Sequence, residues 1–280
     1  MKLTLGHSPD PDDAFMFYAL AKNKIETHGY EFEHILQDIE TLNQRAKRQE
    51  LDISAISIHA YAYVLKNYAL LPCGASMGDN YGPRLVALKP YKKEDLSKLI
   101  IAVPGKLTSA FLALQLYLGL RDVEFDYRVV GFDEIFDTVK AGRADVGLII
   151  HEGQLTYKEE GFHLIEDLGA WWHQKTGGLP LPLGGNVIRK GIGAEKLPLI
   201  NQILKESIQY SLDHRPEALA YAKQWGRGLD DALNDEFVGM YVNELTLDYG
   251  ERGRKAIELF LQEAHEMGII PEPVELEFVK

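Results

Sequence analysis

The amino-acid sequence predicts an α/β protein of two lobes with a ligand cleft between them, and three observations lead to this prediction. The 280 residues are 46% hydrophobic and 26% charged, which is enough globular chain for two domains. Short strand-like runs alternate with helical patterns, as in a mostly parallel sheet covered by helices. An α/β unit at 94–178 interrupts a larger, discontinuous lobe made of residues 1–93 and 179–280, so the chain should cross between the lobes twice.

The larger lobe begins with strands and helices in alternation. We expect strands at 2–6, 31–36 and 52–56, and helices from Pro11, over 40–48 and over 59–67. Asp10 is the expected N-cap of the first helix, and Pro11 is its first residue. The carboxylates of Asp12 and Asp13 in the first turn favour the helix dipole. Beyond the inserted unit, helical segments are expected at 197–213, 216–225, 230–243 and 250–267.

The inserted lobe follows a glycine-rich loop, a strand at 85–88 and a polar connector. Its own strands are expected at 100–103, 126–130 and 146–150, with helices from Thr108 and over 133–142. The last of these strands ends just before His151.

Charge and composition restrict the partners of this protein. The formal net charge of −12 opposes binding to nucleic acid or to an anionic membrane, because the field of the protein repels phosphate. A single cysteine, Cys73, excludes an intramolecular disulfide. No run approaches 18 apolar residues and the start does not read as a secretory signal, so we expect a cytoplasmic protein. Nothing in the sequence points to an obligate protein partner.

In open α/β sheets, ligands bind at the carboxyl ends of the strands, near helix N-termini. The first such strand end is the stretch "GHSPDPDD", where His7 or Ser8 could face the cleft. Its carboxylates also suggest a cation site. However, they lack the spacing of an EF-hand loop and are explained as cap and dipole residues, so we expect no metal.

The second strand end is "DISAISIHAY", where Ser54, Ala55, Ile56 and Ser57 lie at a strand-to-helix turn. The serine hydroxyls and nearby N–H groups could bind an anion or could cap the following helix, and the sequence leaves both readings open. His59 lies inside the helical run and is expected to be a packed or surface residue.

The third strand end is "PGKLTSAF". Thr108 or Ser109 can cap the next helix, and the exposed N–H groups of Ser109 and Ala110 would suit a carboxylate. The pattern of a P-loop is missing, so nucleotide hydrolysis is not implied.

His151 emerges from the strand that ends the inserted sheet. An unperturbed histidine exchanges a proton near neutral pH, which suits a general base, although a lone histidine at a strand end is more often structural. "HEGQL" lacks the second histidine of a zinc peptidase, and no G-x-S-x-G turn supplies a serine nucleophile. Glu152 could orient His151 or be solvated.

Six stretches together resemble the 1,4-dihydroxy-6-naphthoate synthase family of the futalosine route to menaquinone. They are "GHSPDPDDAFMFYAL", "QDIETLN", "VPGKLTSAFL", "VGLIIHEGQLTY", "DLGAWWHQKTGGLPLPLG" and "SLDHRPEAL". The resemblance spans nearly the whole chain. One departure occurs where the family often has "SPCPND": this chain has aspartate at positions 10 and 12, which weakens a ligand role for that turn.

The resemblance implies a type II periplasmic-binding-protein-like fold used for catalysis. The implied substrate is cyclic dehypoxanthine futalosine, a small anionic aromatic molecule. The implied reaction is a carbon–carbon cleavage that needs no redox cofactor. The proton-accepting histidine of the family falls on His151, and its substrate-contacting stretches fall on 54–56 and on Ser109 and Ala110. The hydroxyl and N–H groups of Ser54, Ser57, Thr108 and Ser109 would then hold the substrate.

Two other functions fit the same fold. A noncatalytic solute-binding protein for small anions would normally carry a signal peptide, which the start of the chain does not resemble. Chorismate dehydratase, from the same pathway, fits the "SPDPDDAFMFYAL" start and the "IIHE" stretch poorly.

Overall fold

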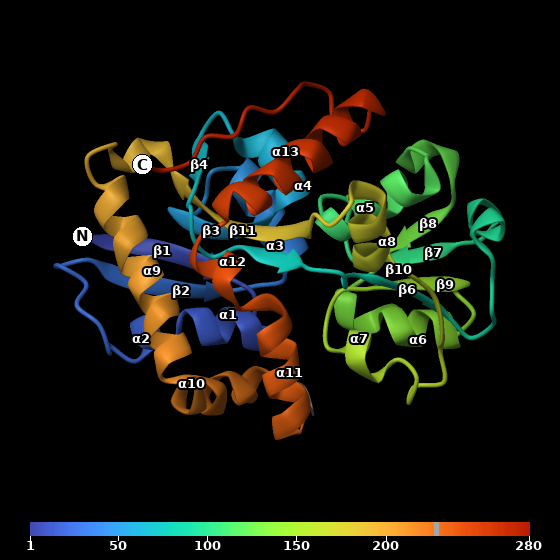
Figure 1. Cartoon of the computed structure of the whole chain (residues 1–280), viewed down its shortest axis with the longest axis horizontal. Coiled ribbons are helices and arrows are strands. Elements are labelled where there is room, and N and C mark those ends of the chain that lie inside the picture. Colours follow the sequence, from blue (N-terminus) through green and yellow to red (C-terminus); the bar gives the residue numbers. More distant parts are fainter. Residues whose placement is uncertain (227–229) are drawn as a thin grey trace.

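The computed structural model describes residues 1–226 and 230–280, and the chain forms two lobes that are each built on a β-sheet (Figure 1). The first sheet follows the order β2-β1-β3-β11-β4, and β5 also pairs with β11. The second sheet follows the order β10-β6-β9-β7-β8. Two sheets covered by helices are the α/β architecture that the alternating sequence pattern predicts.

The first sheet brings several strand ends to one edge. Its strands are β1 (Lys2–His7), β2 (Glu31–Leu36), β3 (Ile53–Ser57), β4 (Tyr68–Leu70), β5 (Ser76–Gly78) and β11 (Leu181–Arg189). Because β1 runs parallel to both β2 and β3, the carboxyl ends of these three strands meet. β11 runs antiparallel to β3, placing Gly184 opposite Ser57 and Asn186 opposite Ala55. The end of β3 therefore lies beside the early part of β11.

Helices from both ends of the chain cover the first sheet (Figure 1). They are α1 (Pro11–Met16), α2 (Tyr18–Ala21), α3 (Ile39–Lys47), α4 (Ile58–Val64), α9 (Leu197–Asp213), α10 (Arg215–Ala222), α11 (Asp231–Tyr241), α12 (Glu244–Leu247) and α13 (Gly250–Glu266). Buried Phe15 and Met16 of α1 share one core with Ile200 and Ile203 of α9. The Ser207 hydroxyl donates to the carbonyl of Met16 at 2.8 Å, which ties the helical tail to the N-terminal unit.

The second sheet contains β6 (Arg84–Ala87), β7 (Ile101–Val103), β8 (Tyr127–Val129), β9 (Val146–Ile149) and β10 (His163–Asp167). Its helices are α5 (Ser109–Leu118), α6 (Ile135–Lys140), α7 (Gly153–Thr156) and α8 (Leu168–Thr176). Short 3₁₀ helices lie at Lys93–Lys98, Asp122–Glu124, Phe132–Glu134, Lys190–Ile192 and Lys223–Trp225.

The position of β6 differs from the predicted division of the chain, in which residues 1–93 all belonged to the first lobe. β6 pairs antiparallel with β9 and β10, so the chain already enters the second sheet at Arg84. Its short apolar run gave no sign of its partners, and the polar connector after it resembled a linker. The other limits of the two lobes stay a prediction.

The two chain crossings between the lobes lie side by side. β5 pairs with the start of β11, with Gly78 opposite Leu181. The guanidinium of Arg252 donates to both carboxylate oxygens of Asp79, at 2.7 and 2.6 Å, and to the carbonyl of Gly178. The α13 helix therefore holds both crossings through one arginine, and the carboxylate contact has the two-pronged geometry that favours arginine.

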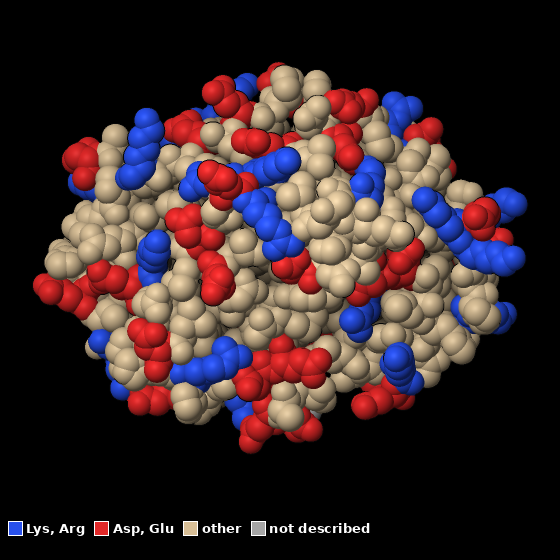
Figure 2. Space-filling view, in the orientation of Figure 1, with Lys and Arg blue, Asp and Glu red and all other residues tan. Residues whose placement is uncertain are grey.

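Acidic and basic side chains are interspersed on the face of the molecule in Figure 2, where no continuous basic stripe is visible. Among the helices of the described residues, none has the length and apolar character needed to cross a bilayer.

Gly169, at the start of α8, packs directly against the first crossing. A Cβ atom at Gly169 would overlap the backbone carbonyl of Tyr81, which cannot move aside as a flexible side chain can. We therefore predict that Gly169→Ala lowers the free energy of unfolding by about 1–3 kcal/mol, the usual cost of overpacking. Urea denaturation measures this loss. The matched control is Gly191→Ala, whose Cβ would meet no atom within 4 Å; equal stability loss in both variants would contradict the packing argument.

Candidate active site

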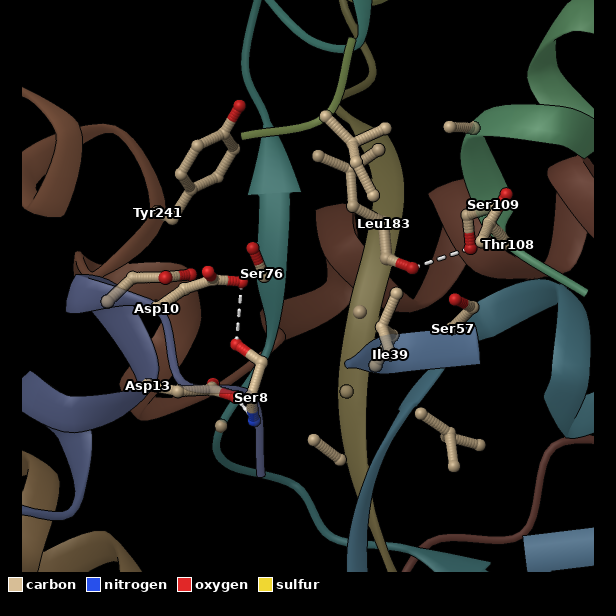
Figure 3. A pocket seen from close by; sticks show the side chains of 18 of the residues that line it. Ser8, Asp10, Asp13, Ile39, Ser57, Ser76, Thr108, Ser109, Leu183 and Tyr241 are labelled. Carbon is tan, nitrogen blue, oxygen red and sulfur yellow. Dashed lines mark hydrogen bonds between the residues drawn. The ribbon is translucent and has the colours of Figure 1, made fainter. Parts of the chain in front are cut away.

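A cavity of about 130 Å³ lies between the two lobes (Figure 3). Its lining comes from strand ends and helix N-termini of both lobes. The lining residues are Ser8, Asp10, Asp12, Asp13, Met16, Ile39, Ala55, Ile56, Ser57, Gly74, Ser76, Pro83, Thr108, Ser109, Ala110, Ile150, Gln154, Leu183, Gly184, Gly185, Asn186, Phe237 and Tyr241. This is the position that the topology of an open α/β sheet predicts for a ligand.

Six of the seven residues predicted to bind substrate line this cavity: Ala55, Ile56, Ser57, Thr108, Ser109 and Ala110. Ser54 does not line it. The Ser54 side chain is fully buried, and its hydroxyl donates to the carbonyl of Ala55 at 2.9 Å. Ile56 is on the same face of β3 as Ser54 and does line the cavity, so the two differ in position along the strand: Ser54 lies further inside the sheet, beside Gly6 of β1. Whether the six residues contact substrate stays a prediction.

The end of β3 is held by Asn43 of α3. The Asn43 side-chain carbonyl accepts from the backbone N–H of Ser57 at 2.8 Å, and its amide donates to the Ser57 hydroxyl oxygen at 3.1 Å. Because the Ser57 oxygen accepts this bond, its own proton can be directed at a ligand. Ser57 occupies the N-cap position of α4 but makes no side-chain capping bond. Of the two roles that the sequence left open for this turn, anion binding and helix capping, the Ser57 hydroxyl therefore does not perform the capping.

The N-terminus of α5 forms the opposite wall of the cavity. Thr108 caps the helix by accepting from the N–H of Phe111 at 3.1 Å, as the sequence predicts. The Ser109 hydroxyl donates to the carbonyl of Leu183 at 2.5 Å and accepts from the N–H of His59. The hydroxyls of this wall are therefore engaged in structural bonds. The first-turn N–H groups of Ser109 and Ala110 have no partner within the helix and can bind an anion.

His59 is packed, as expected, and it joins the two walls. Only 3% of the side chain is exposed, and its ring nitrogen Nδ1 lies 3.4 Å from the carbonyl of Thr108. Burial lowers the pKa of His59 to about 4, so the ring is neutral at pH 7. Neutral His59 adds no charge to the cavity and fixes α4 against the N-terminus of α5.

An acidic turn between β1 and α1 forms a third wall (Figure 3). The Asp13 carboxylate accepts from the backbone N–H of Ser8 at 2.6 Å, and the Ser8 hydroxyl donates to Asp10 at 2.8 Å. Asp10 occupies the N-cap position of α1, but its side chain makes no capping bond. No group of three or more metal-binding side chains is arranged to hold an ion in the described part of the chain.

Burial governs the protonation of the acidic turn. It raises the pKa of Asp13 to about 7, with a further increase from the charge of Asp10, against the lowering effect of the Ser8 hydrogen bonds. The pKa of Asp12 is also well above its usual range, because of burial and the neighbouring charges of Asp13 and Asp10. A turn that reads as fully anionic in the sequence therefore carries protons near neutral pH.

His151 lies beside the cavity but does not line it, whereas Ile150 and Gln154 do. Its ring packs edge-on against Phe132 and Phe136, with ring centroids 5.6 and 6.0 Å away. The side chain is 11% exposed. The proposed base is therefore turned toward the aromatic core of the second lobe in this structure.

The hydrogen bonds of His151 specify its tautomer. Nδ1 accepts from the backbone N–H of Gly153 at 3.0 Å, so the proton of the neutral ring is on Nε2. Nε2 is buried and has no hydrogen-bond partner among the described residues. The Glu152 carboxylate is 3.5 Å from Nδ1 and is also buried. At this distance the carboxylate could accept a hydrogen bond from the tautomer that carries its proton on Nδ1, once the bond to Gly153 is released.

Sequence reasoning missed four polar lining residues, namely Ser76, Gln154, Asn186 and Tyr241. The Asn186 amide donates to the carbonyl of Gly74 at 3.4 Å, and its side-chain carbonyl is buried without a partner among the described residues. That oxygen can accept a bond from a ligand hydroxyl. Gln154 lies three residues after His151 in the stretch "VGLIIHEGQLTY", which gave no sign that its side chain reaches the cavity. The other three residues lie outside the quoted stretches, and only the folded chain brings them to the cavity.

The tryptophan pair lies outside the cavity. Trp172 is fully buried, and its indole N–H donates to the carbonyl of Pro180 at 3.1 Å. Trp171 packs edge-on against Tyr117. Both rings belong to the packing between α8 and its neighbours.

The raised pKa of Asp13 makes a prediction about stability and pH. The pKa of Asp13 is near 3.8 in the unfolded chain and about 7 in the folded protein, so between these two pH values the folded state binds the extra proton. The stabilising contribution of Asp13 to the free energy of unfolding is therefore lost as the pH rises through that window. Asp13→Asn removes the titration and keeps an oxygen for the Ser8 N–H. The melting temperature of the variant relative to wild type should therefore rise from about pH 5 to about pH 8 and then level off.

Thermal unfolding of both proteins across this range tests the prediction. The buried histidines titrate equally in both, so their effect cancels in the difference. A difference in melting temperature that stays constant or falls with pH would show that Asp13 is charged in the folded state throughout.

Comparisons with known proteins agree with the sequence motifs. The model of a family described as menaquinone biosynthesis matches residues 3–266. A 1,4-dihydroxy-6-naphthoate synthase of Thermus thermophilus is 38% identical over 268 residues, 95% of either chain. One of Streptomyces coelicolor is 34% identical over 275 residues, covering 96% of this chain and 95% of the relative.

Solved structures give the same picture. Protein AF1704 of Archaeoglobus fulgidus superposes with a TM-score of 0.90 at 40% identity, covering 96% of this chain and 98% of its own. The alkanesulfonate-binding protein SsuA of Xanthomonas axonopodis, bound to MOPS, has a TM-score of 0.72 at 12% identity over 98% and 95% of the two chains, which confirms the periplasmic-binding-protein-like fold. The chain belongs to the menaquinone-biosynthesis family that contains the 1,4-dihydroxy-6-naphthoate synthases.

Proposed function

We propose that this protein is a carbon–carbon lyase that converts cyclic dehypoxanthine futalosine to 1,4-dihydroxy-6-naphthoate, with His151 as the proton acceptor. The sequence identity of 34–38% to two synthases, over 95–96% of this chain, supports the reaction. The observation that supports the site most directly is the cavity, where two predicted substrate-binding segments meet next to the His151 segment. A cytoplasmic location is part of the same proposal and rests on the biosynthetic role of the relatives.

The substrate would be held mainly by neutral groups. The N–H groups of Ser109 and Ala110 suit its carboxylate, since they lie at the N-terminus of the ten-residue α5 helix. The Ser57 hydroxyl can donate to the substrate, and the Asn186 side-chain carbonyl can accept from it. Three sides of the substrate would then be fixed, and this orientation makes a proton transfer effective.

His151 must turn before it can act as a base. In the observed position Nδ1 accepts from Gly153 and Nε2 carries the proton, so neither nitrogen offers a lone pair to the substrate. Rotation of the ring toward the cavity would release Nδ1 from Gly153. If the ring proton then moves from Nε2 to Nδ1 by exchange with water, the Nδ1–H group could donate a hydrogen bond to Glu152, leaving the lone pair of Nε2 free. Glu152 would thus act as the group that orients the base.

The proton that His151 removes would come from the sugar-derived ring of the substrate. The electron pair left behind forms a double bond in the sugar-derived part as the carbon–carbon link to the bicyclic part breaks. The electron pair of the broken bond passes to the bicyclic part, which takes up one proton, and formation of its aromatic ring helps to drive the cleavage. General-base catalysis of this kind typically contributes a factor of about 10² to 10⁴.

A noncatalytic binding protein remains the alternative from a different class. The likeness to solute-binding proteins concerns the fold alone, at 12% identity. The synthases are about three times as similar in sequence to this chain, at 34–38% identity. The enzyme is therefore the better supported function, and chorismate dehydratase has no comparable support.

The role of His151 can be tested by its removal. We predict that His151→Ala lowers kcat for cyclic dehypoxanthine futalosine by about 10²- to 10⁴-fold while the affinity for the compound changes little, because the base does not hold the ground state. Mass spectrometry of the product and calorimetry of binding measure the two quantities.

The matched control is His163→Ala, which removes an exposed histidine from β10 of the same lobe. It should keep the wild-type rate. If His151→Ala and wild type turn over equally fast, the base is another group. If wild type binds the compound without converting it, the binding-protein function replaces the enzyme.

A further inference from the structure

A buried hydrogen bond joins the two lobes at one end of the cavity. The Tyr241 hydroxyl, on α11 of the first lobe, donates to the side-chain carbonyl of Gln154, on α7 of the second lobe, at 2.8 Å. Only 4% of Tyr241 and 1% of Gln154 are exposed. Both residues line the cavity, and Figure 3 shows Tyr241 at the end where the acidic turn lies.

Gln154 belongs to the same short segment as His151. Its backbone N–H donates to the carbonyl of His151 at 2.8 Å. Its own carbonyl accepts from the guanidinium of Arg84, which also pairs with Asp167 at 3.1 Å. The backbone of Gln154 is therefore fixed within the second lobe, while its side chain is fixed to the first.

Tyr241 is itself held rigidly. Its ring packs edge-on against Phe237 and Tyr81, with ring centroids 5.3 and 6.0 Å away. The Tyr81 hydroxyl donates to the carbonyl of Met240, which fixes the last turn of α11. Burial raises the pKa of Tyr241 far above its usual value, so the hydroxyl keeps its proton and donates throughout the physiological range.

We propose that Tyr241 is a positioning residue for the proposed base: its hydroxyl holds Gln154, and with it segment 151–154, at the place from which the His151 ring can reach the cavity. The inference rests on the proposed role of His151. The bond exists only when the two lobes are together, so it also ties the placement of the base to closure of the cleft.

The chemistry of the pair supports this role over simple packing. Loss of the hydroxyl would leave the Gln154 oxygen buried without a donor, a state that favours movement of the segment toward water. The neighbouring substrate-binding groups lie on α5 and β11, which are linked by the bond from Ser109 to Leu183 and do not depend on Tyr241. Catalysis and substrate binding should therefore respond differently to the loss.

Tyr241→Phe tests the proposal, because it removes the hydroxyl and keeps the ring. We expect kcat to fall by about 10- to 100-fold, the effect of leaving a buried acceptor unpaired, while the affinity for 1,4-dihydroxy-6-naphthoate changes less than about threefold. Amide hydrogen exchange in segment 151–157 should become faster in the free protein. The control is Tyr68→Phe, whose buried hydroxyl donates to the carbonyl of Leu51 within the first lobe; it should leave kcat and this exchange unchanged.

A double-mutant cycle tests whether Tyr241 and Gln154 affect kcat together, as one unit, or independently of each other. If Tyr241 acts through Gln154, then Tyr241→Phe combined with Gln154→Leu should lower kcat by no more than the worse single variant. Multiplying losses would overturn the proposal.

Two further results would also overturn it: an unchanged kcat in Tyr241→Phe, or unchanged exchange in segment 151–157. Should wild type itself fail to convert the substrate, the proposed function is wrong, and the exchange measurement alone decides whether Tyr241 holds the segment.

Discussion

The antiparallel pairing of β11 with β3 is the constraint on which the cavity depends. It places residues 183–186, which follow the second crossing between the lobes, beside the end of β3. The carbonyl of Leu183 then receives the Ser109 hydroxyl, which brings the N-terminus of α5 to the same place. One strand of the first sheet thus positions groups of the second lobe. A shift of β11 by one residue would reverse the faces of its side chains and remove Asn186 from the cavity.

Local sequence signals predicted much of the fold and of the walls. Strand ends and helix starts depend on nearby residues, so the turns at 54–57 and 108–110 were recognisable as neighbours of a ligand site. Ser54 does not line the cavity because it lies further inside β3 than its neighbours, and the sequence did not specify how far along the strand the cavity extends. Tyr241 and Asn186 come from distant segments, which only tertiary packing brings together. β6 was misplaced for the same reason, since its partners lie about 60 to 80 residues downstream.

A protein of net charge −12 can hold an anionic substrate if the cavity itself is less negative than the surface. Two features have this effect. Burial keeps protons on part of the acidic turn, as the raised pKa values of Asp12 and Asp13 indicate. The opposite wall offers backbone N–H groups, whose dipoles attract a carboxylate without adding a mobile charge. Aspartate at positions 10 and 12, where the family often has cysteine and asparagine, is therefore compatible with binding, provided that the turn stays buried.

The proposed base, His151, rests outside the cavity among aromatic side chains of the second lobe. With its ring between Phe132 and Phe136 and Nδ1 bonded to Gly153, His151 carries its proton on the nitrogen that would have to receive one. To act as the proposed base, the ring must therefore change both orientation and tautomer, and the Glu152 carboxylate, 3.5 Å from Nδ1, would stabilise the alternative tautomer. A backbone segment that moved freely would make this change unproductive. In the proposed mechanism, the bond from Tyr241 to Gln154 would limit the motion to the His151 side chain, and in this way a residue 90 positions away in the sequence would contribute to the proton transfer.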